Sequence, residues 1–301
     1  MIIASYFSTK PKLVLNMLSV PISNKLHVTF SNKTAGAYVE QPWFVLTSSK
    51  HYDLAISKDK IISQCYTFEA DHSEGPTFAI PDGCIDILFD CDQTNPEAKV
   101  CGSTLEARNA ELKHRHRYFG VRYKLGVIPG FLGVSADELV NSEVDLLDIM
   151  PRLESAFAQI VSEGDFGNQV EIFRRCYEGK TPRTPSPLTL ETIKIICEKK
   201  GTLRIGQLEA LTGYTCRTLQ RQFQSDMGMS PKAFSRIVRC QFAVHEINCQ
   251  NSIAFSDLAS DLGFSDQPHF LREFKKCVSA TPANYQRQVQ QSAYMQRIRC
   301  A

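Results

Sequence analysis

The spacing of apolar residues changes near the middle of the chain. In the first 180 residues, runs of β-branched and aromatic residues separated by turn residues cover 27–31, 61–68, 85–89 and 119–123. Such runs are typical of strands. Residues 151–161 and 170–177 instead repeat apolar side chains at the spacing of an amphipathic helix. We therefore expect a β-rich N-terminal region that ends in helices.

An internal repeat follows in the C-terminal region. Residues 205–215 align with residues 255–265 at an offset of 50, and beyond this segment the offset becomes 51. The larger offset aligns Leu219 and Phe223 with Phe270 and Phe274. The apolar residues of each pair are at i and i+4, so they share one face of a helix. The repeat predicts two similar helical units.

Each unit carries the residues of a sharp turn between two short helices. Gly213 and Gly263 stand where the first helix must stop, at a position where a positive φ is cheap for glycine. Thr215 and Ser265 follow as the expected N-caps of the second helix. Two short helices joined by a glycine turn form the helix-turn-helix arrangement, whose second helix enters the major groove of DNA.

Arginine and glutamine recur on the expected outer face of these second helices. Arginine can donate two hydrogen bonds to guanine, and glutamine can pair in the same way with adenine. The side chains expected at the DNA are Thr215, Cys216, Arg217, Gln220, Arg221, Gln224, Ser265, Gln267, His269, Arg272, Lys275 and Lys276. For Lys275, Lys276 and Arg239, phosphate contact and plain surface charge both stay open.

A longer helix is expected between the two units. Ser230 is a suitable N-cap and Pro231 suits the first helical position. The apolar residues that then keep helical spacing are Phe234, Ile237, Val244 and Ile247. This helix would hold the two units at a fixed separation.

The proline-rich segment 181–187 divides the chain. Its three prolines fit neither a helix nor a central strand and suggest a short, semi-rigid linker. We interpret residues 1–180 as a sensing or dimerisation domain and residues 188–301 as a DNA-binding domain of seven helices, with helix-turn-helix units near 205–224 and 255–276. The expected fold class is α+β, with a β-rich domain followed by an all-α domain.

The charge of the chain changes sign at the same place. The formal net charge is +2, but residues 181–301 carry +7 and residues 1–180 carry −5. A basic region suits a polyanionic partner, whereas the acidic region does not. The charge distribution therefore favours nucleic acid as the partner of the C-terminal region.

The C-terminal motifs resemble a known family. Residues 258–276, LASDLGFSDQPHFLREFKK, followed by TPANY at 281–285, resemble the signature of AraC/XylS-type transcription regulators. The spacing of Gly213, Thr215, Arg217, Leu219, Arg221 and Phe223 is similar to the first helix-turn-helix of that family. Two residues depart from the pattern, because Glu209 stands where a small alanine is usual and Pro268 replaces a serine. The Glu209 departure predicts looser packing in the first unit, while a proline so early in a helix is tolerable.

The N-terminal region carries a second resemblance. Residues 81–89, 118–123 and 133–139 are similar to an uncharacterised domain that precedes AraC-type DNA-binding regions. This resemblance implies a β-rich sensor module with helices at its end, and it names no ligand.

Together the two resemblances imply a sequence-specific transcription regulator controlled by a small-molecule effector. The implied partners are promoter DNA, RNA polymerase and a second copy bound through residues 1–180, and no cofactor is expected. Two alternatives stay open. One is a repair-type enzyme fused to a DNA-binding module. Such an enzyme would require a cluster of cysteines that binds zinc. The other is a ligand-independent regulator whose N-terminal region only dimerises.

The eleven cysteines are scattered and include no CxxC pair. This distribution argues against a disulfide scaffold and against a CxxC zinc site, and it favours a cytosolic protein with reduced thiols. Cys84, Cys91 and Cys101 with His114 and His116 could form a metal cluster, but their spacing fits no ligand pattern. We interpret His114 and His116 instead as alternate residues of one strand.

Few other residues suggest chemistry. Cys216 could sense redox state, because a helix N-terminus lowers the pKa of a thiol. Asp82 and Asp86 could form an acid–base pair, but Pro-Asp-Gly indicates a turn before a strand, and alternation then places Asp82, Cys84 and Asp86 opposite Ile85 and Ile87. No catalytic motif, secretory leader or run of 18 apolar residues occurs, so an enzyme or a membrane protein is not expected.

Overall fold

The structure is a computed structural model that describes residues 40–71, 76–177, 183–250 and 252–301. The strand expected at 27–31 and the first residues of the proline-rich segment lie outside these ranges. None of the described helices is both long and apolar enough to cross a membrane.

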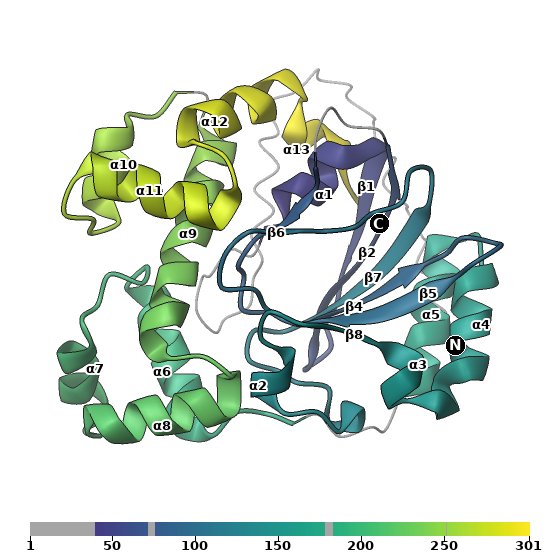
Figure 1. The fold of residues 1–301 in the computed structure, drawn as a ribbon, viewed down its shortest axis with the longest axis horizontal. Helices are drawn as coiled ribbons and strands as arrows, with labels where there is room; N and C mark the ends of the chain where they lie inside the picture. The colour runs from purple at the N-terminus through teal and green to yellow at the C-terminus, as the bar shows by residue number, and fades with distance from the viewer. Residues whose placement is uncertain (1–39, 72–75, 178–182, 251) are drawn as a thin grey trace, which may run out of the picture. The chain divides into compact units, whose positions relative to one another are not determined.

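A seven-stranded sheet forms the centre of the N-terminal region (Figure 1). Its strands, in spatial order, are β8 (Glu143–Asp145), β5 (Glu97–Cys101), β4 (Asp86–Asp90), β7 (Arg117–Tyr123), β2 (Ile62–Ala70), β1 (Ser48–Ile56) and β9 (Ile298–Cys300). All neighbours are antiparallel except β1 and β9, which are parallel. A smaller sheet pairs β3 (Phe78–Ala79) with β6 (Arg108–Asn109).

Alternation along the strands gives the large sheet one apolar face. Ile87 and Phe89 of β4 and Phe119 and Val121 of β7 are buried together on this face. The helices that cover it are α3 (Leu146–Ile149), α4 (Glu154–Ser162) and α5 (Phe166–Tyr177), with a 3-10 turn at Pro151–Leu153 before α4 (Figure 1). The amphipathic helices expected at 151–161 and 170–177 are confirmed as α4 and α5.

The opposite face of the sheet carries the polar side chains of the same strands. Asp82, Cys84 and Asp86 lie on this side, as the alternation predicts, whereas Ile85 and Ile87 belong to the apolar core. Helix α1 (Pro42–Thr47) and the loop that contains β6 lie above this face. A short helix, α2 (Ala136–Leu139), and a 3-10 turn at Gly130–Leu132 connect β7 to β8.

Eight helices make up the described C-terminal region, one more than expected. They are α6 (Pro187–Glu198), α7 (Ile205–Thr212), α8 (Cys216–Met227), α9 (Pro231–Cys249), α10 (Phe255–Asp261), α11 (Gln267–Val278), α12 (Pro282–Gln291) and α13 (Tyr294–Arg297). Helices α7 and α8 form the first helix-turn-helix unit, and α10 and α11 form the second (Figure 1). The additional helix is α13, which leads into β9.

The expected fold class is confirmed, and the strands expected at 61–68, 85–89 and 119–123 are β2, β4 and β7. Strands β1, β3, β5, β6, β8 and β9 were not expected. Strand β9 attaches the end of the chain to the sheet, since Ile298 pairs with Tyr52 and the Ala301 N–H donates to the Leu54 carbonyl at 2.8 Å.

Candidate DNA-binding helices and ligand cavity

The first helix-turn-helix unit turns at a left-handed glycine. Gly213 ends α7 with a φ of +74°, and the Thr215 side chain then caps α8 by accepting from the Thr218 N–H at 3.3 Å. Leu219 and Phe223 are buried, each about 1% exposed, and anchor α8 to its neighbours. The inner face of α8 is thus fixed by apolar packing.

Most of the outer face of α8 is open to a partner. Arg217, Gln220 and Arg221 are exposed, and Thr215 is exposed at the helix start. Gln224 is exposed too, but its side chain donates to Asp137 and to the Gly228 carbonyl. Among the described residues, none forms an ion pair with Arg217 or Arg221, so both guanidinium groups are available to bases or phosphates.

The structure argues against a reactive thiol at Cys216. The Cys216 Sγ donates to the Glu209 carboxylate at 2.8 Å, and this hydrogen bond raises the pKa of the thiol rather than lowering it. The expectation from the helix N-terminus is therefore wrong, because an adjacent carboxylate outweighs the helix dipole. Glu209 is itself exposed and faces this thiol.

The second unit has the same order with one shift. Gly263 adopts a φ of +67°, but the N-cap of α11 is Asp266, whose side chain accepts from the His269 N–H at 2.7 Å. The prediction of Ser265 as N-cap is wrong, because the helix starts one residue later at Gln267. Pro268 lies in the first turn of α11, where no intrahelical partner is lost.

The second unit also presents polar side chains on its outer face. Phe270 and Phe274 are buried, while Ser265, Gln267, Arg272, Lys275 and Lys276 are exposed. His269 is half-buried, with its Nδ1 at 3.1 Å from the Ser265 Oγ, and Lys276 pairs with Glu273 at 3.7 Å.

Arg239 is not a surface charge. It is half-buried on α9, with its guanidinium 4.8 Å from the centre of the Phe264 ring, and burial lowers its pKa. Plain surface charge is wrong for this residue, because it packs the connecting helix against the second unit, whereas phosphate contact stays a prediction.

Several contacts join the sheet region to the helices of both units. Gly228, which ends α8 with a φ of +68°, lies so close to Ala136 of α2 that an added Cβ would be 2.4 Å from the Ala136 carbonyl oxygen. Gln224 donates to Asp137 of α2 at 3.1 Å. Helix α2 is therefore packed directly on the first candidate recognition helix.

The connecting helix α9 is held by the loop before β4. Gln241 of α9 donates to the Pro81 carbonyl at 2.7 Å, and the His245 ring lies 2.8 Å from the Glu40 carboxylate. Ser230 caps α9 by accepting from the Ala233 N–H at 3.2 Å. The helix that spaces the two units thus touches the sheet region at its middle.

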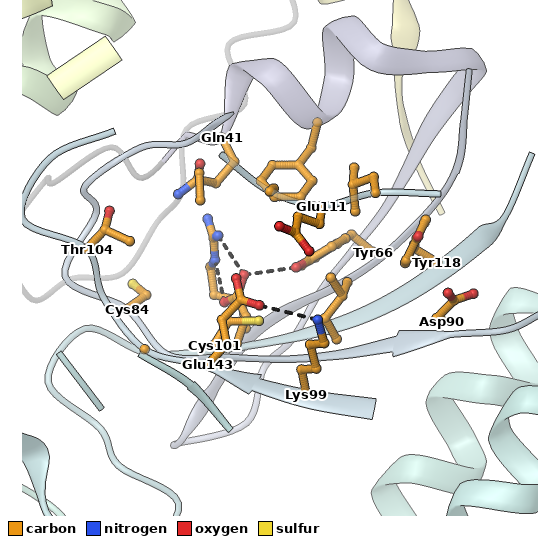
Figure 2. A pocket seen from close by; sticks show the side chains of 18 of the residues that line it. Gln41, Tyr66, Cys84, Asp90, Lys99, Cys101, Thr104, Glu111, Tyr118 and Glu143 are labelled. Carbon is orange, nitrogen blue, oxygen red and sulfur yellow. Dashed lines mark hydrogen bonds and ion pairs between the residues drawn. The ribbon is translucent and has the colours of Figure 1, made fainter. Parts of the chain in front are cut away.

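A cavity of about 410 Å³ lies on the polar face of the sheet (Figure 2). The strands β4, β5 and β7 form its floor, and α1 with the loop of residues 104–113 covers it. Its lining comprises Gln41, Phe44, Tyr66, Ala79, Ile80, Asp82, Cys84, Asp86, Leu88, Asp90, Glu97, Lys99, Cys101, Gly102, Thr104, Ala110, Glu111, Leu112, Lys113, Tyr118, Arg122 and Glu143. Its volume is within the usual range for a small-molecule site.

One end of the cavity is built around a buried arginine. Arg122 is 3% exposed and pairs with Asp86 at 2.8 Å and with Asp82 at 3.1 Å. The Tyr66 hydroxyl donates to Asp86 at 2.9 Å, and Gln41 donates to Asp82 at 2.8 Å. Burial raises the pKa of Asp82, and Arg122 offsets this effect only in part.

The other end holds a second charged cluster. Lys113 lies 2.8 Å from Glu97 and 3.5 Å from Asp90, and the His116 ring lies 2.8 Å from Asp90. Lys99 pairs with Glu143 at 3.6 Å. The carboxylates Asp90, Glu97 and Glu143 come from β4, β5 and β8, which are neighbours in the sheet.

His114 and His116 do not belong to a strand. His114 lies in a turn that precedes β7, and Arg115 between them has a φ of +61°, which breaks the strand geometry. The interpretation of the two histidines as alternate strand residues is therefore wrong. Across the described residues, no three His, Cys, Asp or Glu side chains gather closely enough to hold a metal ion.

The residues of the cavity were not identified from the sequence. A signal was present, because Asp82 and Asp86, four residues apart, and Arg122 are charged residues in otherwise apolar segments. Such charges must lie on the face opposite the core. Register then brings two of them together, since Asp86 pairs directly with Arg122 across β4 and β7.

Two family models match the chain. Residues 208–288 match a helix-turn-helix domain, and residues 59–145 match a domain of unknown function (DUF6597). The first match contains both candidate recognition helices, and the second contains every lining residue of the cavity except Gln41 and Phe44. No curated protein matches the chain.

Several solved structures are similar to the chain. A regulator with an AraC-type DNA-binding domain from Chromobacterium violaceum is 22% identical, with 35% of this chain and 94% of that chain covered and a TM-score of 0.32. The C-terminal domain of AraT, a response regulator from Geobacillus stearothermophilus, is 19% identical, with coverage of 34% and 85% and a TM-score of 0.32. ToxT from Vibrio cholerae O395 is 13% identical, with coverage of 81% and 98% and a TM-score of 0.37. Likeness at these scores carries no functional argument.

Proposed function

We propose that this DNA-binding transcription regulator reads promoter DNA with α8 and α11, which lie in the AraC-type helix-turn-helix domain of residues 208–288. A small molecule held in the cavity controls this binding. The observation that carries the proposal is the pairing of two exposed, arginine-bearing helices with a separate cavity in one chain. RNA polymerase and a second copy bound through residues 1–180 stay predictions.

The exposed faces of α8 and α11 support DNA readout. Arg217 and Arg221 on α8 and Arg272 on α11 are exposed on helices whose opposite faces are buried. An exposed guanidinium can pair with guanine O6 and N7 in the major groove. Two such helices reading successive major-groove segments on one face of DNA must be separated by about 34 Å, one helical turn.

The contacts of the loop before β4 support control by a ligand. Asp82 lines the cavity, and the preceding Pro81 carbonyl accepts the hydrogen bond from Gln241 of α9. Gln41 donates to Asp82, and its neighbour Glu40 pairs with His245 of α9. A ligand that moves Asp82 therefore acts on the same short segments that hold the helix between the two DNA-binding units. Such shared contacts allow coupling between the two sites.

The experiment that tests DNA readout is selection of a preferred duplex from random sequence, followed by footprinting on that duplex. Two protected major-groove segments, one helical turn apart and on one face, are expected. Protection of a single segment would show that only one unit reads DNA. The variants Arg221→Ala and Arg272→Ala should each weaken protection in a different segment, because they lie on different helices.

A further inference from the structure

We propose that the cavity takes an organic cation, an amine or guanidinium attached to an apolar group. The identity of this ligand as the regulatory effector rests on the proposed function, but its binding in the cavity does not. The arguments are the charge of the lining, the pairing of its cations, the aromatic walls and an unsatisfied hydroxyl.

The lining has more negative than positive side chains. Three cations face six carboxylates, namely Asp82, Asp86, Asp90, Glu97, Glu111 and Glu143. With all of them ionised, the formal charge of the lining is −3. Partly enclosed charges of one sign raise the local concentration of oppositely charged ligands.

All three cations already have carboxylate partners. Arg122 is shared by Asp82 and Asp86, Lys113 by Asp90 and Glu97, and Lys99 pairs with Glu143. An anionic ligand would have to approach Lys99 or Lys113 against the charge of the carboxylates already beside them, or displace an aspartate from Arg122. Displacing one from Arg122 would be particularly unfavourable, because it would leave a buried aspartate without its counter-charge.

Glu111 is the carboxylate that has no cation. It lies in the loop above the sheet, and Figure 2 shows its carboxylate turned toward the interior of the cavity. Within the described residues, Glu111 forms no ion pair. Glu111 is exposed to solvent, and a ligand cation in the cavity could pair with its carboxylate without displacing another cation.

The rest of the lining suits the apolar part of such a ligand. Phe44, Tyr66 and Tyr118 contribute aromatic surface, and aromatic faces attract organic cations. Thr104 also lines the cavity at 9% exposure, and its hydroxyl lacks a hydrogen-bond partner among the described residues. Figure 2 shows Thr104 at the edge of the cavity, where a bound ammonium or amide group could satisfy it.

A metal ion is the less suitable cation. Within the described residues, the acidic and sulfur side chains do not gather in threes at a distance that would hold one.

The test is calorimetric titration of the full chain, without DNA, with three probes of matched shape and different charge. These are phenethylamine, phenethyl alcohol and phenylpropionate, at constant ionic strength. The amine should bind at least ten-fold more tightly than the alcohol, and the carboxylate should bind more weakly than both. Equal affinities, preference for the carboxylate, or absence of amine binding at millimolar concentration would each overturn the proposal.

Two variants should shift amine affinity in opposite directions. Glu111→Gln removes the unpaired carboxylate and should weaken amine binding about three- to five-fold, the usual size of one partly exposed charge pair. Lys99→Gln removes a competing cation and frees Glu143, so amine binding should tighten by a similar factor. The matched control is Glu154→Gln, an exposed residue at the start of α4 and outside the cavity, which should leave affinity unchanged. Shifts of the same sign in the first two variants would show that the amine binds elsewhere.

This experiment is independent of gene regulation. Amine binding without any effect on DNA affinity would retain the ligand class and contradict effector control. DNA binding that responds to phenylpropionate and not to the amine would retain effector control and overturn the ligand class.

Discussion

The substitution Gly228→Ala probes the packing of α2 on the first candidate recognition helix, and Gly213→Ala is its matched control. Both glycines end a helix of the first unit with a left-handed backbone, at φ +68° and +74°. An alanine in that conformation costs about 1–2 kcal/mol at either site. The sites differ in space, since an added Cβ at Gly213 meets nothing within 4 Å.

At Gly228 the added methyl would overlap backbone. It would lie 2.4 Å from the Ala136 carbonyl oxygen and 2.7 Å from the Val140 side chain. Because the Ala136 carbonyl belongs to a helix that is capped at both ends, α2 and α8 must move apart. Overpacking of this kind costs about 1–3 kcal/mol. We expect a total loss of about 2–5 kcal/mol for Gly228→Ala and only about 1–2 kcal/mol for Gly213→Ala.

Urea unfolding followed by circular dichroism gives the free energies of unfolding for both variants. The fluorescence of Trp43, the single tryptophan, reports separately on the contact of α1 with α11, because its indole N–H donates to the Val278 carbonyl at 2.9 Å. Equal losses of stability in the two variants would refute the argument that α2 and α8 are in close backbone contact. An increase of DNA affinity in Gly228→Ala would indicate that α2 restrains α8.

Three further outcomes are expected. In gel-shift titration, Arg221→Ala and Arg272→Ala should each weaken binding to the preferred duplex by about 1–3 kcal/mol and leave binding to scrambled duplex nearly unchanged. Lys275→Ala should weaken binding to both duplexes and flatten the salt dependence. Equal losses on both duplexes for the arginine variants would contradict base readout. The affinity for the amine should fall as the pH is lowered through the raised pKa of Asp82, because the protonated carboxyl group no longer attracts a cation. An affinity that stays constant through this pH range would exclude Asp82 from the site. Alkylation under denaturing, non-reducing conditions should label the eleven cysteines, and mass spectrometry would reveal any native disulfide as an unlabelled pair. In a separate alkylation of the native protein, Cys249 and Cys300 should be labelled first because they are exposed.

The helices of the C-terminal region were predictable because their signals are local. The caps Thr215, Ser230 and Thr281 each lie within three residues of the N–H that they accept from, so sequence spacing alone places the helix starts. The error at Ser265 shows the limit of such signals. Ser265 and Asp266 can both cap a helix, and the sequence does not decide which of the two begins it.

The cavity and the sheet edges depend on contacts that no local signal encodes. Asp86 and Arg122 are 36 residues apart and meet because β4 and β7 are neighbours, a fact of strand order rather than of either segment. Strand β1 was missed because residues 48–51 are all polar, so only Tyr52 and Leu54 alternate as buried residues before the exposed Ile56. Strand β9 is three residues long and follows eight helices, so nothing before it predicts a strand.

The last prediction concerns the separation of the two regions. A fragment of residues 186–301 should fold alone, because the buried Leu219, Phe223, Phe270, Phe274 and Tyr285 lie wholly within it. It loses polar and apolar partners in the sheet region. The Gln241 amide and the Val278 carbonyl can bind water instead, whereas Tyr285 loses its ring contact with Trp43. Strand β9 loses its pairing with β1, which affects only the last residues.

The fragment should therefore bind the preferred duplex, since both candidate recognition helices and the charge of +7 remain in residues 181–301. It should bind more weakly than a full-length protein that dimerises through residues 1–180, because two linked sites act at high effective concentration. It should also lose any response to phenethylamine, because the whole cavity lies outside it. Footprinting of fragment and full chain, with and without the amine, measures all three. A fragment that is helical by circular dichroism and yet leaves the duplex unprotected would show that α8 and α11 do not form a DNA-binding surface on their own, whereas a fragment that still responds to the amine would place the cation site in the C-terminal region.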